Sequence, residues 1–330
     1  MHLLVAGGAG YIGSHAVRLF LERGHDVTVF DNLIYGRRWA VPADTLVVGD
    51  LGDSCSVEQV FRRKPVDAVV HFAAFTYVGE SVTDPAKYYR NNTINAIGLL
   101  DACRNHGVSK FVFSSTAATY GVPERVPIDE GCATNPINPY GRSKLAIEWV
   151  LEDYAHAYGM SFAALRYFNA AGAHPSGEIG ENHDPETHLI PLVLQTALGL
   201  RPQIEMFGTD YPTPDGSCIR DYIHVDDLAE AHLLAVEQLR PSVRWKLNLG
   251  TGRGYSVREV IDACRKVTGK TITVKECPRR AGDPPVLVAA SDLARKSLGW
   301  TPRYTALEPI VETAWKWHSG KWLELRQKHD

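Results

Sequence analysis

The sequence predicts an α/β fold in which a doubly wound parallel sheet is joined to a smaller α/β domain. Two observations support this prediction. Short apolar runs alternate with segments of helical period through the first half of the chain, and a glycine-rich turn follows the first run. Strands buried on both faces read as continuous apolar runs, and their alternation with helices is typical of a parallel sheet.

The individual elements follow in chain order. The strands expected for the large sheet are 3–6, 27–30, 46–48, 68–72, 111–114 and 162–167. A helix is expected after the glycine-rich turn, through 17–23, and another at 140–158, where apolar residues recur on one side. Later elements are a strand at 245–249, a capped helix at 256–268 and a strand at 271–274. Gly, Pro, His and Asp are dense through 173–191 and 208–216, which indicates long functional loops.

The glycine-rich turn is the run Gly7-Gly8-Ala9-Gly10-Tyr11-Ile12-Gly13, between the first expected strand and the first expected helix. Glycines at this spacing permit a tight turn, close approach of the backbone to a diphosphate and packing of helix against strand. The N-terminus of the helix adds amide donors and a favourable dipole. The turn therefore predicts a Rossmann-type dinucleotide site.

A carboxylate, Asp31, follows the second expected strand. There it can accept hydrogen bonds from the adenosine ribose and repel a 2′-phosphate, which favours NAD over NADP. The nearby Arg37 and Arg38 soften this preference. Asp50 and Leu51 follow the third strand as candidates to flank the adenine, and the small residues after Phe72 leave room for the cofactor.

These observations divide the chain into two domains. We expect residues 1–168 to form an NAD-binding Rossmann domain and residues 169–330 to form mainly a substrate-binding domain. The assignment of residues at about 218–248 is left open between the two. The length of 330 residues is sufficient for both cores.

The composition excludes several classes of function. A formal net charge of -3 gives no global attraction to nucleic acid or to an anionic membrane, and no apolar segment reaches membrane length. The six cysteines are scattered, with no CxxC pair and no pairing with histidines at zinc-ligand spacing. We expect a cytoplasmic enzyme with no metal site, no nucleic-acid partner and no membrane partner.

Tyr140 and Lys144 lie four residues apart where a helix is expected to begin. That spacing puts the phenol and the ammonium on one helical face. A phenol, with a pKa near ~10, is a poor base at neutral pH, but an adjacent cation favours the phenolate. The pair predicts a proton-transfer device. A solvated helix face is the competing interpretation of any isolated Tyr-x-x-x-Lys, so the other motifs decide between the two.

With these motifs the chain resembles the extended short-chain dehydrogenases/reductases and, among them, the UDP-glucose 4-epimerase family. The resemblance covers nearly the whole length. It rests on the motifs GGAGYIGSH at 7–15, FSSTAATYG at 113–121, PYGRSK at 139–144, RYFN at 166–169, HPSG at 174–177, DYPTPDG at 210–216, RDYIHV at 220–225 and RRAGD at 279–283.

The resemblance implies an isomerase that epimerises UDP-glucose and UDP-galactose reversibly at C4, through a transient 4-keto sugar and with tightly bound NAD. It implies Tyr140 as the acid/base, Lys144 as the residue that tunes it and binds the nicotinamide ribose, and Thr116 as the hydrogen-bond partner of the sugar. The implied cofactor-binding residues are Gly7, Gly10, Tyr11, Ile12, Gly13, Asp31, Asn32, Asp50, Leu51, Phe72, Ala73, Ala74, Asn91, Ser114, Tyr140, Lys144 and Tyr167. The implied substrate-binding residues are Thr116, Tyr140, Asn169, His188, Leu189, Phe207, Arg220, Tyr222, Arg280, Asp283 and Leu287, with Arg220 and Arg280 on the diphosphate.

Alternatives remain open at the sugar. Leu287 stands where some members of the family have a tyrosine near C2 of the sugar, so UDP-GlcNAc and UDP-GalNAc are alternative substrates. UDP-pentoses share the same C4 chemistry.

Two other functions are also weighed. A dehydratase would need an acidic pair after Thr116, where Ala117 and Ala118 stand, and a non-catalytic NAD sensor would have no need of the Tyr/Lys pair.

The resemblance also implies a homodimer that pairs through helices near 86–105 and 140–158.

Overall fold

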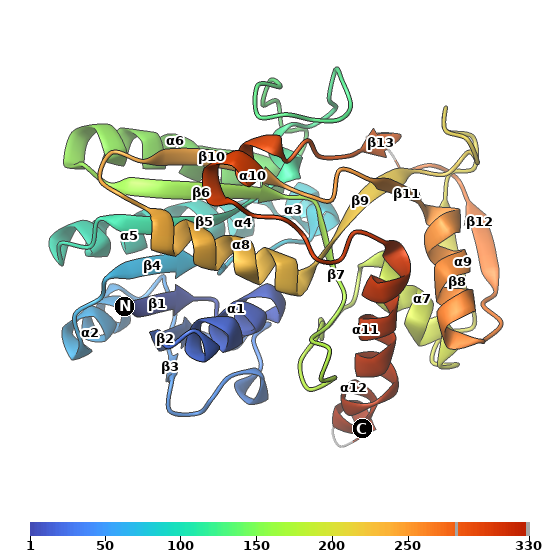
Figure 1. Cartoon of the computed structure of the whole chain (residues 1–330), viewed down its shortest axis with the longest axis horizontal. Helices are drawn as coiled ribbons and strands as arrows, with labels where there is room; N and C mark the ends of the chain where they lie inside the picture. Colours follow the sequence, from blue (N-terminus) through green and yellow to red (C-terminus); the bar gives the residue numbers. More distant parts are fainter. Residues whose placement is uncertain (281–282, 328–330) are drawn as a thin grey trace.

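The computed structural model of the protein describes residues 1–280 and 283–327. Its largest sheet has seven strands, all parallel, in the order β10-β6-β5-β4-β1-β2-β3 (Figure 1). The predicted doubly wound α/β fold is confirmed. The strands are β1 (His2–Ala6), β2 (Asp26–Asp31), β3 (Leu46–Val48), β4 (Ala68–His71), β5 (Lys110–Thr116), β6 (Ser161–Tyr167) and β10 (Arg244–Leu249).

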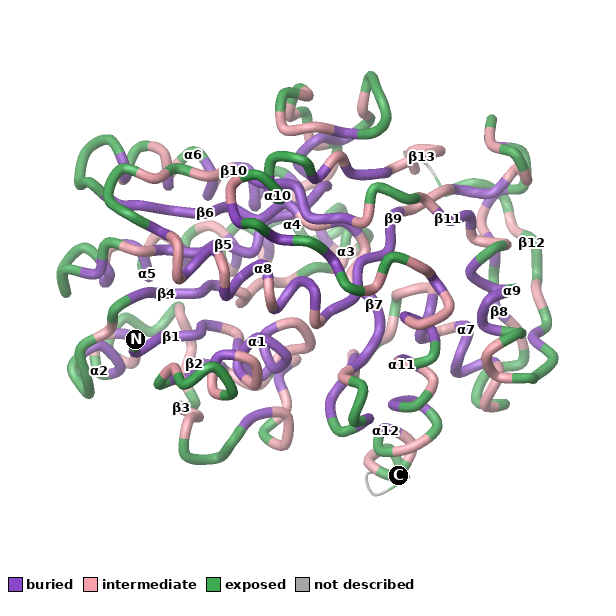
Figure 2. The backbone as a smooth tube through the Cα atoms, viewed as in Figure 1, coloured by how far each residue is buried: buried purple, intermediate pink, exposed green. Residues whose placement is uncertain are grey.

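Both faces of this sheet are buried. Leu3 and Val5 of β1 pack in one core, whereas Leu4 and Ala6 pack in another, because successive side chains of a strand point to opposite faces. This explains the uninterrupted apolar runs, whose central strands are purple in Figure 2. Helices α1 (Tyr11–Glu22) and α8 (Val225–Gln238) cover the first face, and α2 (Ser54–Arg63), α5 (Asn95–Asn105) and α6 (Pro139–Tyr158) cover the second.

Helix α6 is the expected helix at 140–158, and local signals at both ends fix its limits. The Asn138 side chain accepts a hydrogen bond from the amide of Gly141 at 2.8 Å, and Pro139 occupies the first helical position, where no amide donor is needed. Gly159 ends the helix at a φ of 72°. Tyr140 is thereby held in the first turn.

The remaining strands form two smaller sheets, at the right of Figure 1. One holds β7 (Asn169–Ala171), β9 (Ile219–His224), β11 (Gly254–Ser256) and β13 (Val286–Leu287), and the other pairs β8 (Ile204–Phe207) with β12 (Val274–Cys277). The helices beside them are α7 (Leu189–Ala197), α9 (Val257–Thr268), α11 (Leu307–Ser319) and α12 (Lys321–Gln327).

The two expected elements at 256–268 and 271–274 have different outcomes. The expected helix is confirmed as α9, which begins with a reciprocal capping box between Ser256 and Glu259. The expected strand at 271–274 is wrong. Ile272 fills the apolar core from an irregular segment, and strand pairing begins only at Val274, opposite Ile204.

The chain returns to the large sheet after β9. Residues 225–249 supply α8, which packs on α1, and then β10, which pairs with β6. The division into two domains near residue 168 stays a prediction. The short elements are α3 (Val78–Thr83), α4 (Pro85–Tyr88), α10 (Asp292–Leu298), a π-helical stretch Tyr89–Ile94, and 3₁₀ turns Arg38–Ala40 and Ala117–Thr119.

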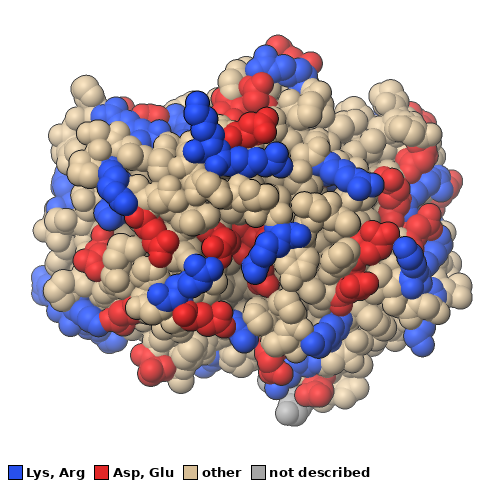
Figure 3. Space-filling model, in the orientation of Figure 1, with Lys and Arg blue, Asp and Glu red and all other residues tan. Residues whose placement is uncertain are grey.

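The surface carries both signs of charge. On the face drawn in Figure 3, blue and red side chains are interspersed rather than gathered by sign. Within the described ranges 1–280 and 283–327, no helix is both long and apolar enough to span a bilayer.

Candidate functional site

The glycine-rich turn joins β1 to α1 and leaves a shallow backbone cradle. Gly7 has a φ of +78°, and a Cβ added there would lie 2.4 Å from the amide nitrogen of Ala73. A Cβ added at Gly13 would lie 2.3 Å from the carbonyl oxygen of Gly7. Gly10 caps α1 without a side chain, so the first amides of that helix remain for an anion. These features fit the diphosphate of a dinucleotide.

The residues predicted to face the adenosine lie at the carboxyl ends of β2 and β3. The Asp31 carboxylate accepts hydrogen bonds from the amides of Ala9 at 3.0 Å and Leu33 at 2.8 Å. Burial raises the pKa of Asp31, and these two amides lower it. Asn32 donates to the Asp50 carboxylate at 2.7 Å. The arrangement links Asp31 directly to the glycine turn, so a ribose held by this carboxylate would lie beside the diphosphate cradle.

The predicted catalytic residues come together where β5 ends against the first turns of α6. The Thr116 hydroxyl lies close enough to the Tyr140 phenol to lower its pKa, and each residue is 8% exposed. Lys144, one turn further along α6, donates from Nζ to the Ser114 carbonyl oxygen at 2.8 Å. The Ser114 hydroxyl in turn shares a 2.6 Å hydrogen bond with the phenol of Tyr167. The sheet edge thus gathers two phenols, two hydroxyls and one amine.

The electrostatics of this site differ from the sequence-based expectation that Lys144 lowers the pKa of Tyr140. Burial raises the pKa of Tyr140, and the nearby hydroxyl of Thr116 opposes that rise. Burial also lowers the pKa of Lys144 to about 7, so the amine loses much of its charge near neutrality. Thr116, rather than Lys144, is the residue that favours the phenolate in this arrangement.

His71, at the end of β4, lies close enough to Lys144 for the charge to act on it. The imidazole stacks on Phe113 at 5.8 Å, and neither ring nitrogen has a hydrogen-bond partner among the described residues. Burial, and secondarily the Lys144 charge, lower the pKa of His71 to about 3. The neutral ring is therefore the form that the fold accommodates.

This histidine predicts an acid sensitivity. Its folded pKa lies below the unfolded value of about 6.5, so below that pH the unfolded chain takes up a proton that the folded chain does not. Stability present above pH ~6.5 is therefore lost as the pH falls. We expect His71→Leu to lose less stability than wild type between about pH 6.5 and pH 4 in urea unfolding. The exposed His156→Leu on α6 is the control; equal losses in all three proteins would contradict the assignment.

A buried ion pair behind the catalytic residues was not predicted from the sequence. Arg166 of β6 donates to the Glu148 carboxylate of α6 through Nε at 2.9 Å and Nη2 at 2.5 Å, and both side chains are almost fully buried. Glu148 also accepts from the Ser115 hydroxyl at 2.6 Å, while Arg166 donates to the Tyr120 hydroxyl at 2.9 Å. The network fixes α6 against β5 and β6. The sequence does contain one indication of this pair: Arg166 is an arginine inside the largely apolar run expected to form a buried strand.

Four of the residues predicted to hold the substrate lie in the four-stranded sheet. Asn169 of β7 stands opposite Tyr222 of β9, and Arg220 of β9 stands opposite Leu287 of β13. Arg220 forms an ion pair with the carboxylate of Asp283, which precedes β13.

A second arginine of the predicted diphosphate pair is held differently. The Arg280 guanidinium lies over the ring of Phe207, 3.9 Å from its centre, at the end of β8. His188 and Leu189 stand at the start of α7. Ala281 and Gly282, which belong to the motif at 279–283, lie outside the described residues.

The remaining predicted cofactor residues follow the strand ends. Ala73 follows β4 beneath the glycine turn, and the ring of Phe72 lies 4.6 Å from that of His232. Asn91 donates to Asn92 at 3.0 Å. Ala73 and Phe72 therefore lie next to the cradle, and Asn91 lies in the π-helical stretch 89–94. The other predicted residues are Ile12 in α1, Leu51 after β3 and Ala74 after β4.

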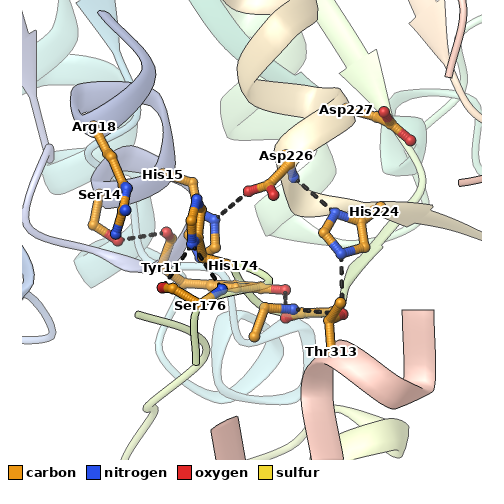
Figure 4. A network of polar contacts seen from close by, with 12 residues as sticks. Tyr11, Ser14, His15, Arg18, His174, Ser176, His224, Asp226, Asp227 and Thr313 are labelled. Carbon is orange, nitrogen blue, oxygen red and sulfur yellow. Dashed lines mark hydrogen bonds and ion pairs between the residues drawn. The ribbon is translucent and has the colours of Figure 1, made fainter. Parts of the chain in front are cut away.

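A polar network ties the glycine turn to the smaller sheets (Figure 4). Tyr11 donates from its hydroxyl to the Gly172 carbonyl oxygen at 2.6 Å. The imidazole of His15 lies 2.7 Å from the Asp226 carboxylate at the start of α8, and the neighbouring His224 ring contacts Thr313 of α11 at 3.0 Å. These contacts hold the cofactor cradle in register with the sheet that carries the predicted substrate residues.

Comparison with known proteins gives consistent similarities. A family model described as "NAD dependent epimerase/dehydratase family" matches residues 3–250. The UDP-glucose 4-epimerase of Halalkalibacterium halodurans is 54% identical over 319 residues, which are 96% of each chain. The structure of UDP-glucose 4-epimerase from Brucella ovis in complex with NAD superposes with a TM-score of 0.92 at 52% identity, covering 95% of this chain and 97% of that chain. The UDP-Glc/GlcNAc 4-epimerase from Campylobacter jejuni gives 0.84 at 44% identity, covering 96% and 99%.

Proposed function

Since this chain belongs to the NAD dependent epimerase/dehydratase family, we propose that it interconverts UDP-glucose and UDP-galactose by inverting C4 of the sugar. One observation carries the assignment: the phenol of Tyr140 is buried beside Thr116, whose hydroxyl lowers its pKa, at the carboxyl end of β5. In a doubly wound sheet that edge is where ligands bind. The glycine cradle lies at the same edge, so a proton acceptor and a dinucleotide would meet there.

The reaction requires a proton and a hydride to leave the same carbinol and later return to it. Bound NAD supplies the hydride acceptor and donor. Tyr140 takes the proton of the 4-hydroxyl, Thr116 holds the sugar oxygen by a hydrogen bond, and a 4-keto sugar results. After the ketone turns its other face toward the cofactor, Tyr140 returns the proton to the new 4-hydroxyl. No net oxidation occurs.

The rotation of the ketone sets a requirement on binding. The nucleotide end must be held firmly while the sugar remains free to turn. Arg220 and Arg280 suit the first task because planar guanidinium groups bind phosphate oxygens through paired donors. In the structure Arg220 pairs with Asp283, so the diphosphate would compete with a carboxylate already present. Asn169 and Leu287, on two strands that both pair with β9, are the proposed sugar-side contacts.

A direct assay tests the assignment. The purified protein is incubated with UDP-galactose and no added cofactor, and the anomeric proton signals are followed by NMR. UDP-glucose is the expected product, because NAD that is regenerated in each cycle can remain bound. Failure to form UDP-glucose, even with added NAD, would favour a non-catalytic NAD sensor.

UDP-GlcNAc is a second candidate substrate, and Leu287 favours it. This side chain is half-buried on the two-residue strand β13 beside Arg220, and it is smaller than tyrosine. The Campylobacter jejuni protein, similar to this chain over nearly its whole length, is a UDP-Glc/GlcNAc 4-epimerase by its description.

Enlarging Leu287 is therefore expected to discriminate between the two sugars. Leu287→Tyr should lower kcat/KM for UDP-GlcNAc about 10- to 100-fold relative to UDP-glucose, because overpacking of this size costs about 1–3 kcal/mol. The volume-conserving Leu287→Met is the control and should leave the ratio nearly unchanged. A ratio equally unchanged in Leu287→Tyr would remove Leu287 from the sugar pocket.

We also propose a homodimer that pairs through α5 and α6. Ile94, which directly precedes α5, is 60% exposed, and Trp149 and Tyr158 of α6 are 59% and 53% exposed. Large exposed apolar side chains on the elements that would pair support this contact. Sedimentation equilibrium, which gives the mass in solution, tests the pairing. Residence in a reducing cytoplasm stays an expectation.

A further inference from the structure

Four side chains of the segment 181–188 converge on one point. One ligand atom from each of Glu181, His183, Glu186 and His188 lies within 4.8 Å of all the others. The Nδ1 atoms of His183 and His188 lie 3.0 Å and 2.5 Å from the same oxygen, Oε1 of Glu181. His188 Nδ1 is 3.4 Å from Oε1 of Glu186, and His183 Nδ1 is 3.9 Å from Oε2 of Glu186.

These separations can be compared with the edges of a coordination tetrahedron. Zinc binds imidazole nitrogen and carboxylate oxygen at about 2.0–2.2 Å, so neighbouring ligand atoms in a tetrahedral site lie about 3.3–3.5 Å apart. Of the four distances in the cluster, 3.0 Å and 3.4 Å lie near that value, whereas 2.5 Å is shorter and 3.9 Å, measured to the other Glu186 oxygen, is longer. An ion would therefore replace the hydrogen bonds of the two imidazoles to Glu181. Two imidazoles with two carboxylates are also a donor set that suits zinc, whereas calcium and magnesium prefer oxygen alone.

The surroundings orient the ligands and leave access for an ion. Oε1 of Glu186 accepts hydrogen bonds from the amides of Thr187 at 2.8 Å and His188 at 2.9 Å, which fixes its direction. The side chain of Glu181 is 3% exposed and that of Glu186 is 6% exposed. Burying two carboxylate charges costs free energy unless positive charge lies nearby. The ring of His188 is 43% exposed and opens the cluster to solvent.

A third imidazole lies on the helix that contacts the cluster. Trp317 of α11 donates from its indole nitrogen to the Glu181 carbonyl oxygen at 2.8 Å. The next residue, His318, is 1% exposed, and its Nδ1 has no hydrogen-bond partner among the described residues. A buried imidazole nitrogen without a hydrogen-bond partner is unusual.

We propose that Glu181, His183, Glu186 and His188 form a structural Zn²⁺ site. The ion holds the segment that leads into α7, at whose start His188 and Leu189 stand. It also connects that segment to the glycine turn, because the ring of His183 meets the ring of Tyr11 edge-on at 6.2 Å. The site is separate from the proposed proton transfer and replaces the expectation of no metal. The segment 181–188, which supplies all four ligands, contains no cysteine, so sulfur is not among the proposed ligands.

The first test uses the wild-type protein without an affinity tag. It is equilibrated with Zn²⁺, desalted, and its metal content is measured by plasma mass spectrometry. We expect about one retained Zn²⁺ per chain, a midpoint of thermal unfolding raised by about 5 °C or more, and reversal of that shift by a chelator. X-ray absorption should show nitrogen and oxygen neighbours without sulfur, which separates the site from adventitious binding to the six cysteines.

Matched variants localise the ion. His183→Gln and Glu186→Gln, purified separately, should each retain at least about 10-fold less Zn²⁺ than wild type, since each removes one ligand. His174→Gln removes a histidine from the same long segment but lies outside the cluster, and it should bind Zn²⁺ as wild type does. If a cluster variant fails to fold, the Zn²⁺ content and the unfolding midpoint of the wild-type protein still test the proposal.

One result would overturn the proposal. Wild-type protein that retains no Zn²⁺ above the level of the cluster variants, with an unchanged unfolding midpoint, would mean that the two histidines carry protons and form ion pairs with the carboxylates. Such a result would leave the proposed epimerisation untouched, because UDP-galactose turnover is measured independently. Conversely, loss of turnover in a protein that retains Zn²⁺ would count against the epimerase assignment alone.

Discussion

Tyr140→Phe is expected to lower kcat about 100- to 10,000-fold, the range that a positioned acid/base contributes to proton transfer. The variant loses only the phenolic oxygen of a buried side chain that lies beside Thr116. The remaining ring keeps its contacts in the first turn of α6. NAD content and the midpoint of unfolding should therefore stay near the wild-type values, while turnover of UDP-galactose, followed by coupled assay or NMR, nearly disappears.

Two companions make the result specific. Tyr158→Phe changes a phenol on the same helix that is 53% exposed, and it should retain full activity. Thr116→Val should lower kcat by a smaller factor and move the pH profile upward, because the variant lacks the hydroxyl that lowers the pKa of Tyr140. A Tyr140→Phe protein with activity within about threefold of wild type would rule out Tyr140 as the base.

Glu148→Ala is expected to reduce the free energy of unfolding by about 3–5 kcal/mol, the cost of leaving a buried charge without its partner. The Arg166 side chain is 4% exposed, and it would keep only the bond to the Tyr120 hydroxyl among its described polar partners. Urea unfolding measures the loss as a shift of the midpoint.

A control variant on the same helix tests whether the loss of stability comes from the burial of the ion pair or from the ion pair alone. Glu152 pairs with Lys246 at 2.9 Å, but both side chains are 30–38% exposed. Glu152→Ala should leave the urea midpoint almost unchanged, since exposed ion pairs contribute little. The double variant Glu148→Leu with Arg166→Met should recover much of the stability lost by Glu148→Ala, because well-packed apolar residues can replace a buried pair. A double variant no better than the single one would show that the network matters for more than its charges.

The large sheet could be predicted because its central strands are continuous apolar runs in the sequence. In β1, β4 and β6, nearly every residue is buried, so apolar runs mark them without ambiguity. The glycines were equally informative, since Gly7 and Gly13 have no room for a side chain. The small sheets were harder. Strand β7 is only Asn169–Ala171, β13 has two residues, and β12 places Lys275 and Glu276 toward solvent.

The site was predicted in its residues more than in its electrostatics. The helix spacing of Tyr140 and Lys144 indicated correctly that both lie on the buried side of α6, but it could not reveal how strongly burial acts on each. Interactions between distant segments were also out of reach. Glu148 and Arg166 come from different elements, and the pairing of Arg220 with Asp283 joins residues 63 positions apart. The contacts of each residue assigned to cofactor or substrate stay predictions.

The junctions between the sheets constrain how the molecule can move. Only Phe168 separates β6 from β7, and β9 passes into α8 between His224 and Val225 without an intervening residue. Such joints leave no linker in which a hinge could absorb large changes of φ and ψ. We therefore expect the sugar to do the turning during catalysis while the protein around it stays nearly rigid. For the same reason we expect that the smaller sheets could not easily be moved to another scaffold. Their removal would cut the backbone inside continuous elements at several points, whereas an independent domain can be separated by cutting one connecting loop.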